Sequence, residues 1–69
     1  MSKLGLATIK ERIGKARKEK GLTQQDMAKI LGISQPAYSY YESGDKPLPL
    51  RKVRKIAHIL DKPASYLLG

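Results

Sequence analysis

The sequence predicts an all-α fold of five short helices in a single domain, residues 1–69. Three observations support this prediction. Apolar residues recur every three or four positions in successive segments, as they do along one face of a helix. Gly, Pro and N-capping residues separate those segments, and no segment carries the alternating pattern of a half-buried strand. Because 69 residues have room for one small core, helix packing must supply most of the stability.

The first helix is predicted over residues 8–20. Thr8 followed by Glu11 has the spacing of a capping box, which satisfies free N–H groups at a helix start. Gly21 is suited to end the helix, because glycine adopts the left-handed conformation without a Cβ penalty. The apolar face of this helix consists of Ile9, Ile13 and Ala16. Lys and Arg fill the other faces, which we expect to be solvated.

A second helix is predicted over residues 24–31. Thr23 is its N-cap, and Asp26 stands in the first turn, close to the positive end of the helix dipole. Gly32 interrupts the pattern and can turn the chain with a positive φ. The predicted buried side consists of Met27, Ala28 and Leu31.

A third helix is predicted over residues 35–42. Ser34 is the expected N-cap, and Pro36 falls in the first turn, where its missing N–H removes no helical hydrogen bond. Tyr38 and Tyr41 are three residues apart and therefore share a face. We expect this face to pack against the two preceding helices.

Two more helices complete the prediction. A polar connection containing Pro47 and Pro49 leads into a helix over residues 50–60. The apolar positions at helical spacing in that segment are Leu50, Val53, Ile56, Ala57 and Leu60. Pro63 can open a last helix over residues 63–68. Leu67 and Leu68 of that helix are expected to close the core.

Charge is distributed unevenly along the chain. The formal net charge is +8 and the sequence pI is about 10.0, which points to a polyanionic partner. Seven Lys or Arg fall within residues 1–20 and six within residues 46–62, whereas Lys29 is the one base of residues 21–45. A protein that recognises sequence needs cations for phosphates and uncharged hydrogen-bonding groups for base edges. This distribution matches that requirement.

Several function classes are excluded by composition. The chain has no Cys and its one histidine, His58, cannot form a metal site alone. The sequence contains no phosphate-binding loop and no Ser-His-acid or paired-carboxylate set. We therefore predict that the protein is not an enzyme and needs no cofactor. Because no apolar run approaches the length of a membrane span, we predict a cytoplasmic protein that does not bind membranes.

The third predicted helix presents an uncharged face opposite its tyrosine pair. Its exposed positions are Gln35, Pro36, Ser39 and Tyr40. These side chains are short or neutral, and a helix carrying them can enter the major groove of B-DNA, which is about 12 Å wide. The four positions are therefore candidates for contacts with base edges.

The order of these features resembles a known family. The matching segments are Gly21–Ala28, Leu31–Ser34, Ser39–Gly44 and Tyr66–Leu68. In this order and spacing they are similar to the helix-turn-helix family of lambda-type and 434-type phage repressors and Cro proteins, also called XRE-like domains. The resemblance covers nearly the whole chain and implies a lambda-repressor-like fold whose third helix lies in the major groove.

The resemblance also implies roles for individual residues. Gln24 would bind a phosphate and support the third helix, and Gln35 would contact a base, for which a Gln amide suits adenine N6 and N7. Pro36 stands where the family often has a second polar base contact, so an apolar touch on a thymine methyl is the alternative there. Tyr40 matches a base-contacting place, although its hydroxyl could bind a phosphate instead.

Two further sets of residues follow from the same resemblance. The phosphate-binding positions beyond the third helix are Lys46, Arg51 and Lys52. Arg17 and Glu42 match a structural ion pair that ties the first helix to the third, and removing one partner of such a pair costs about 3 kcal/mol. Tyr38 departs from the family, which usually places Val or Ile there. Either the core has an enlarged pocket or the ring leans out and presents its hydroxyl.

The predicted function is sequence-specific binding of double-stranded DNA by a transcriptional repressor. One copy makes few base contacts, so a homodimer on a palindromic operator is expected, with recognition helices about 34 Å apart. Residues 63–68 and the connection before the fourth helix are the expected dimer contact. The end of the sequence at Gly69 is compatible with a repressor fragment that lacks a C-terminal domain.

Three alternatives use other features of the sequence. An antitoxin that binds a toxin protein and represses its own operon would have the same fold, and co-purification of a small neighbour-encoded protein would identify it. A membrane-surface binder built on residues 8–20 would bind liposomes. The four tyrosines could stack on single-stranded bases, but no strand signal supports the sheet that usually carries such aromatics.

Overall fold

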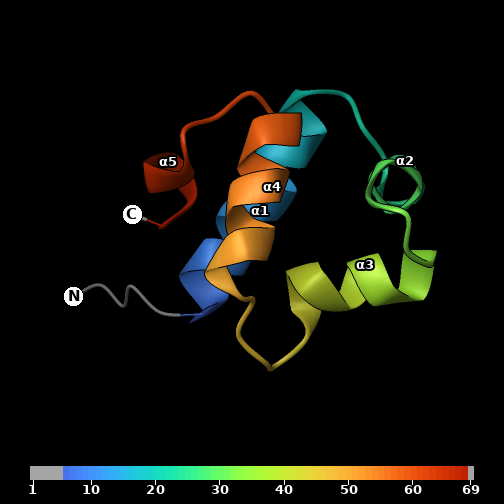
Figure 1. Cartoon of the computed structure of the whole chain (residues 1–69), viewed down its shortest axis with the longest axis horizontal. Helices are drawn as coiled ribbons and strands as arrows, with labels where there is room; N and C mark the ends of the chain where they lie inside the picture. Colours follow the sequence, from blue (N-terminus) through green and yellow to red (C-terminus); the bar gives the residue numbers. More distant parts are fainter. Residues whose placement is uncertain (1–5, 69) are drawn as a thin grey trace.

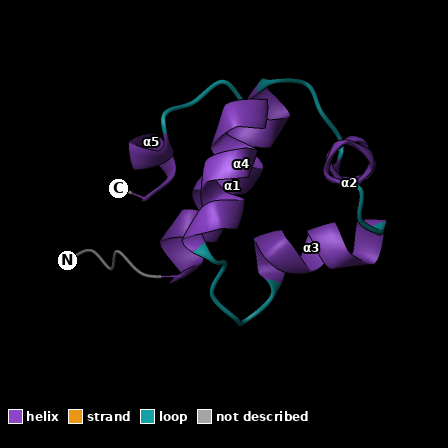
Figure 2. Ribbon diagram, in the orientation of Figure 1, coloured by secondary structure: helices purple, strands orange, loops and turns teal. Residues whose placement is uncertain are grey.

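The computed structural model describes residues 6–68, so Lys3 and Gly69 lie outside the described part of the chain. The described residues form five helices and no strand (Figure 2). The helices are α1 (Leu6–Glu19), α2 (Gln24–Leu31), α3 (Gln35–Ser43), α4 (Leu50–Ile59) and α5 (Ala64–Leu68). The predicted all-α architecture is confirmed.

The helices are arranged around α1 and α4. In Figure 1, α2 and α3 lie on one side of the molecule, α5 lies on the other, and α1 and α4 pass between them. The helix pairs with most contacts are α2 with α3, α1 with α3, α1 with α5, and α4 with α5. Helix α3 therefore rests on the core through α1 and α2.

Some helix ends differ from the prediction. Helix α1 begins at Leu6, so Thr8 lies inside its first turn and the capping box predicted at Thr8 and Glu11 is wrong as a helix start. The other shifts are of one residue: α1 ends at Glu19, α3 at Ser43 and α4 at Ile59, and α5 begins at Ala64. Helix ends fray, so their assignment commonly varies by one or two residues.

The local signals around α2 and α3 are confirmed. Thr23 accepts a hydrogen bond from the Asp26 amide at 3.0 Å, and the Asp26 carboxylate accepts one from the Thr23 amide at 2.9 Å. Gly32 ends α2 with φ of 73° and donates its N–H to the carbonyls of Ala28 and Lys29. The Ser34 hydroxyl accepts from the Ala37 amide at 3.2 Å. These caps fix where the two helices begin and end.

The core takes side chains from all five helices and from the residue that follows α4. Its buried members are Ile13, Ala16, Met27, Ala28, Tyr38, Val53, Ile56, Ala57, Leu60 and Leu67. Ile9, Leu31 and Tyr41 are partly buried and pack against this cluster. A core this small depends on every large side chain in it, because burying one contributes about 1.5–3 kcal/mol.

Two residues of the apolar pattern are exposed instead. Leu50 is 51% exposed at the first position of α4, and Leu68 is 40% exposed in α5. Adjacent helical residues point about 100° apart, so when Leu67 faces the core Leu68 turns away from it. The prediction that both leucines of α5 close the core is therefore wrong for Leu68.

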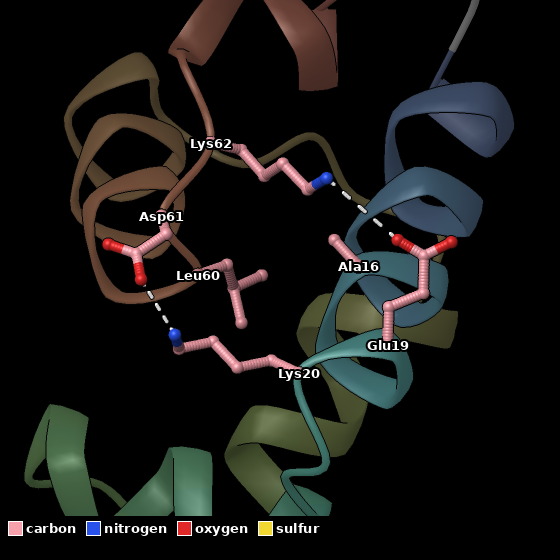
Figure 3. Close-up of a pocket in the computed structure, with 6 residues that line it drawn as sticks. All are labelled: Ala16, Glu19, Lys20, Leu60, Asp61 and Lys62. Atoms are coloured by element: carbon pink, nitrogen blue, oxygen red, sulfur yellow. Dashed lines mark hydrogen bonds and ion pairs between the residues drawn. The ribbon is translucent and has the colours of Figure 1, made fainter.

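Ion pairs join the end of α1 to the α4–α5 connection (Figure 3). The Lys20 ammonium lies 2.7 Å from the Asp61 carboxylate, and the Lys62 ammonium lies 3.9 Å from that of Glu19. All four side chains keep substantial solvent exposure, so these pairs contribute little to stability. They border a shallow hollow between the C-terminal end of α1 and the residues that follow α4.

Candidate nucleic-acid interface

The predicted base-contacting residues lie on one outward surface of α3. Gln35, Pro36 and Tyr40 are exposed, and Ser39 is half-buried. The opposite side of the helix carries Tyr38, which has no exposed surface. Its ring is therefore in the core, and the alternative in which it leans out is wrong. We refer to Gln35, Pro36, Ser39 and Tyr40 as the α3 outer face.

The Glu42 carboxylate joins α3 to α1. The Arg17 guanidinium donates from Nε to Glu42 Oε2 at 2.7 Å and from a terminal nitrogen to Oε1 at 3.2 Å. A third donor of Arg17 binds the Leu22 carbonyl at 2.8 Å. Both charged side chains are 9% exposed. The pair expected from the sequence is thus a nearly buried, two-point ion pair, the geometry in which guanidinium and carboxylate bind most strongly.

Two uncharged side chains complete the surroundings of Glu42. The Tyr38 hydroxyl donates to Oε2 at 2.5 Å, and Gln24 Nε2 donates to Oε1 at 3.2 Å. The carboxylate therefore accepts hydrogen bonds from α1, α2 and α3 together. We call Arg17, Gln24, Tyr38 and Glu42 the Glu42 network. No buried side-chain polar atom in the described part of the chain lacks a partner.

The Glu42 network extends to the α3 outer face. Gln35 Nε2 donates to Gln24 Oε1 at 2.9 Å. Because the Gln24 amide donates to Glu42 and accepts from Gln35, its orientation is set from the core side. The Gln35 amide is held in turn, with its carbonyl and one N–H left for another partner. This link between the two glutamines was not foreseen from the sequence.

The surroundings of Glu42 lower its pKa. Burial alone would raise it, but hydrogen bonds from Arg17, Tyr38 and Gln24 outweigh burial and favour the ionised form. Burial, together with the same carboxylate, raises the pKa of Tyr38, so the hydroxyl remains a donor at all ordinary pH values. At neutral pH, Arg17 and Glu42 are therefore both charged and paired, and Tyr38 is neutral.

We expect stability to fall in acid because of Glu42. Its folded pKa lies below its unfolded value of about 4.3. The stabilisation is therefore present above that unfolded value and is lost as pH falls through the folded one. Urea unfolding from pH 7 to pH 3 measures this loss. The Glu42→Gln variant should show a weaker dependence on pH in that window, and an equal dependence in both proteins would contradict the assignment.

The Tyr40 side chain is held by contacts with the residues that follow α3. Its hydroxyl donates to Asp45 Oδ1 at 2.9 Å, in the connection between α3 and α4. A Cβ atom on Gly44 would lie 2.5 Å from two Tyr40 ring carbons, so the ring covers that glycine closely. The sequence did not predict this arrangement, because a Tyr four residues before a Gly at a helix end does not by itself show whether the ring covers the glycine.

The predicted phosphate-binding bases follow α3 along the chain. Lys46 is exposed in the α3–α4 connection, Arg51 is exposed in the first turn of α4, and Lys52 beside it is half-buried. Lys46 and Arg51 are therefore accessible to an external ligand, and the connection that carries Lys46 begins directly after α3.

Helix α1 was expected to display a solvated basic face, and this is only partly correct. Lys15 and Lys18 are exposed, but Lys10 and Arg17 are buried, with 4% and 7% of the whole residue exposed. Arg12 donates to the Tyr66 carbonyl of α5 at 3.3 Å. Positions 10, 13 and 17 share one helical face, so the burial of Ile13 between the two bases is the signal that could have identified them.

Residues 6–68 contain neither a candidate metal site nor a candidate membrane span. No group of three or more His, Asp or Glu side chains in that range could hold a metal ion. No helix within it is both long and apolar enough to cross a bilayer.

The sequence of this chain is similar to those of helix-turn-helix proteins. Residues 13–67 match the Helix-turn-helix family. The chain is 47% identical over 58 residues to the uncharacterised HTH-type transcriptional regulator YqaE of Bacillus subtilis, covering 84% of this chain and 50% of YqaE. It is 39% identical over 61 residues to the cryptic phage CTXphi transcriptional repressor RstR of Vibrio cholerae, covering 88% of this chain and 54% of RstR.

A third relative comes from a prophage. The SPbeta prophage-derived HTH-type transcriptional regulator YonR of Bacillus subtilis is 40% identical over 58 residues, which are 84% of this chain and 54% of YonR. The chain thus spans about half the length of the curated relatives it matches.

Proposed function

This chain belongs to the helix-turn-helix family, and on that premise we propose that it binds a specific double-stranded DNA sequence through α3 and represses transcription. Repression is proposed by analogy with the similar protein RstR, which is named as a phage transcriptional repressor. The α3 outer face would enter the major groove, which admits a helix. The observation that carries the proposal is the exposed, uncharged outer face of α3, supported from behind by the Glu42 network.

Gln35 is the proposed base-contacting residue with the best support. One N–H of its amide is bound to Gln24, which leaves the second N–H and the carbonyl oxygen of this exposed residue for another partner. A Gln amide presented in this way can donate to adenine N7 and accept from the N6 amino group. The remaining N–H of Gln24 is then available to a neighbouring phosphate. Pro36, Ser39 and Tyr40 are proposed as further contacts along the same face.

The bases that follow α3 would bind the DNA backbone. Lys46, Arg51 and Lys52 are placed in the α3–α4 connection and the first turn of α4. Phosphate contacts fix the position of a protein on the duplex without selecting sequence. We therefore assign affinity to these three cations and selectivity to the α3 outer face.

A homodimer on a palindromic operator follows from the same proposal. A single copy of α3 offers few base contacts, whereas two copies related by a two-fold axis double them. Leu50 and Leu68 are large apolar side chains with 51% and 40% exposure. Leu68 lies in one of the two segments proposed for the dimer contact, and Leu50 directly follows the other. Burying such side chains in an interface would favour pairing.

Gln35→Ala and Arg51→Ala are expected to weaken DNA binding in different ways. Loss of the Gln35 amide should cost about 1–3 kcal/mol at one base pair and relax the preference there. Arg51→Ala should weaken binding to all duplexes alike and lower the salt slope by about one unit, because one phosphate contact is lost. Titrations of each variant with matched and mismatched duplexes at several salt concentrations measure both effects. Equal effects of both variants on every duplex would contradict the assignment of α3 as the recognition helix.

Selection on random duplex DNA tests the proposed function as a whole. The purified protein is incubated with the pool at moderate salt, and the retained duplexes are sequenced. We expect an inverted repeat whose half-sites are about one helical turn apart. Retention without an enriched sequence would indicate binding driven by charge alone and would refute the proposal. Enrichment of a single half-site would refute the dimer but not the recognition helix.

A further inference from the structure

Lys10 of α1 is a buried lysine that the proposed DNA contacts do not use. Only 4% of this residue is exposed. Lysine is rarely buried to this extent unless its ammonium has a partner. Its ammonium donates to the main-chain carbonyls of Tyr41 at 2.8 Å and Tyr40 at 3.2 Å. Burial lowers the pKa of Lys10, and the nearby Asp45 charge partly offsets this effect. The ammonium is therefore directed inward, at the end of α3.

The two carbonyls belong to the last turn of α3, which ends at Ser43. The last four carbonyls of a helix have no N–H partner within it, and the C-terminal end of the helix dipole is negative. A lysine ammonium from another helix can donate hydrogen bonds to these carbonyls, and its positive charge is favourable at the negative end of the dipole. Lys10 thus caps the end of α3 from α1, while the Gly44 amide binds the same Tyr40 carbonyl at 2.7 Å.

The Lys10 contact also bears on the side chain of Tyr40. The ammonium lies 5.7 Å from the centre of the Tyr40 ring, within the range of a cation–π contact. The same ring covers Gly44, and its hydroxyl binds Asp45. Three neighbours therefore hold the last exposed residue of the α3 outer face in one place.

We propose that Lys10 is a positioning residue for DNA recognition, which fixes the end of α3 and the Tyr40 side chain on α1 without contacting a phosphate. This inference rests on the proposed function. Helix α3 is then anchored at both ends: the Glu42 network holds Gln35 at its start, and Lys10 holds Tyr40 at its end. The whole outer face would enter the groove as a rigid unit.

Lys10→Met and Lys15→Met form a matched pair that tests the proposal. Both variants lose one positive charge from α1, but Lys15 is exposed and makes no contact with α3 among the described interactions. The measurements are dissociation constants for the selected operator and for an unrelated duplex over a range of salt concentrations, together with thermal unfolding. Wild-type protein is measured first, because its failure to prefer the operator would refute the proposed function and not the role of Lys10.

We expect Lys10→Met to lower operator affinity about ten-fold, as loss of one hydrogen-bonded charge contact would. Affinity for the unrelated duplex should change little and the salt slope should stay unchanged, because no phosphate contact is lost. Lys15→Met should keep the preference for the operator. A slope lowered by about one unit with equal losses on both duplexes would overturn the proposal, and so would full retention of operator preference by Lys10→Met.

A second variant covers the case in which Lys10→Met does not fold. Lys10→Gln has the same net charge as Lys10→Met but keeps an N–H donor near the α3 carbonyls. The same titrations on this variant should give a measurable loss of operator preference relative to the wild-type protein, again with an unchanged salt slope. A salt slope lowered by about one unit would identify Lys10 as a phosphate contact and overturn the proposal.

Discussion

Arg17→Met is expected to lower the free energy of unfolding by about 3–5 kcal/mol, because it leaves the nearly buried Glu42 carboxylate without its charged partner. The methionine side chain keeps most of the alkyl packing, so the effect reports on the charge. At about 0.05–0.15 kcal/mol per residue, a chain of this length has about 3.5–10 kcal/mol of stability in total. The variant should therefore unfold at a much lower temperature than the wild-type protein, or fail to fold.

Urea and thermal unfolding measure this effect, and Lys20→Met is the matched control. Lys20 also forms an ion pair at 2.7 Å, with Asp61, but both of these side chains are exposed to solvent. Water and salt screen such a pair, so its loss should have little effect on stability. Similar stabilities of the Arg17 and Lys20 variants would contradict the structural role given to the Glu42 network.

Tyr38→Ala should be comparably destabilising, for a different reason. Tyr38 is among the largest fully buried side chains, and removing an aromatic ring from a core costs about 3–5 kcal/mol through lost burial and the cavity left behind. The hydroxyl adds a hydrogen bond to the Glu42 carboxylate. Hydrogen bonds to charged groups contribute about 1.5–3 kcal/mol.

Tyr38→Phe separates the ring from the hydroxyl. It keeps the ring and removes only the bond to Glu42, so it should cost about 1.5–3 kcal/mol and raise the pH at which acid unfolding begins. Urea unfolding of the wild-type, Phe and Ala proteins at pH 7 gives both contributions. If Phe and Ala were equally destabilising, the ring would not be packed as the structure has it.

The contacts around Glu42 fall into a set that stabilises the fold and a set that would bind DNA. Stability rests on Arg17, Tyr38 and Glu42, whereas the groups left free for a ligand belong to Gln24 and Gln35. Substitutions in the first set act on folding, and substitutions in the second act on the proposed DNA contacts. Gln24 belongs to both, because its amide joins Glu42 to Gln35.

The sequence alone determined the five helices and placed their limits to within two residues. Thr23, Asp26 and Ser34 bind backbone groups no more than three residues away, and Gly32 ends α2 by its own backbone conformation. Such signals are local, so they can be recognised without knowing how helices pack. The pairing of Arg17 with Glu42 was foreseen only through the resemblance to a family, because nothing in their spacing of 25 residues predicts a contact.

Only the tertiary structure decided how side chains from different helices meet. It turned Lys10 inward onto the end of α3, joined Gln35 to Gln24, placed the Tyr40 hydroxyl on Asp45 and left Leu50 exposed. These arrangements depend on the relative positions of helices, which periodicity does not specify. Long, flexible side chains such as those of lysine and glutamine can reach several partners, and only the packed neighbours select among them.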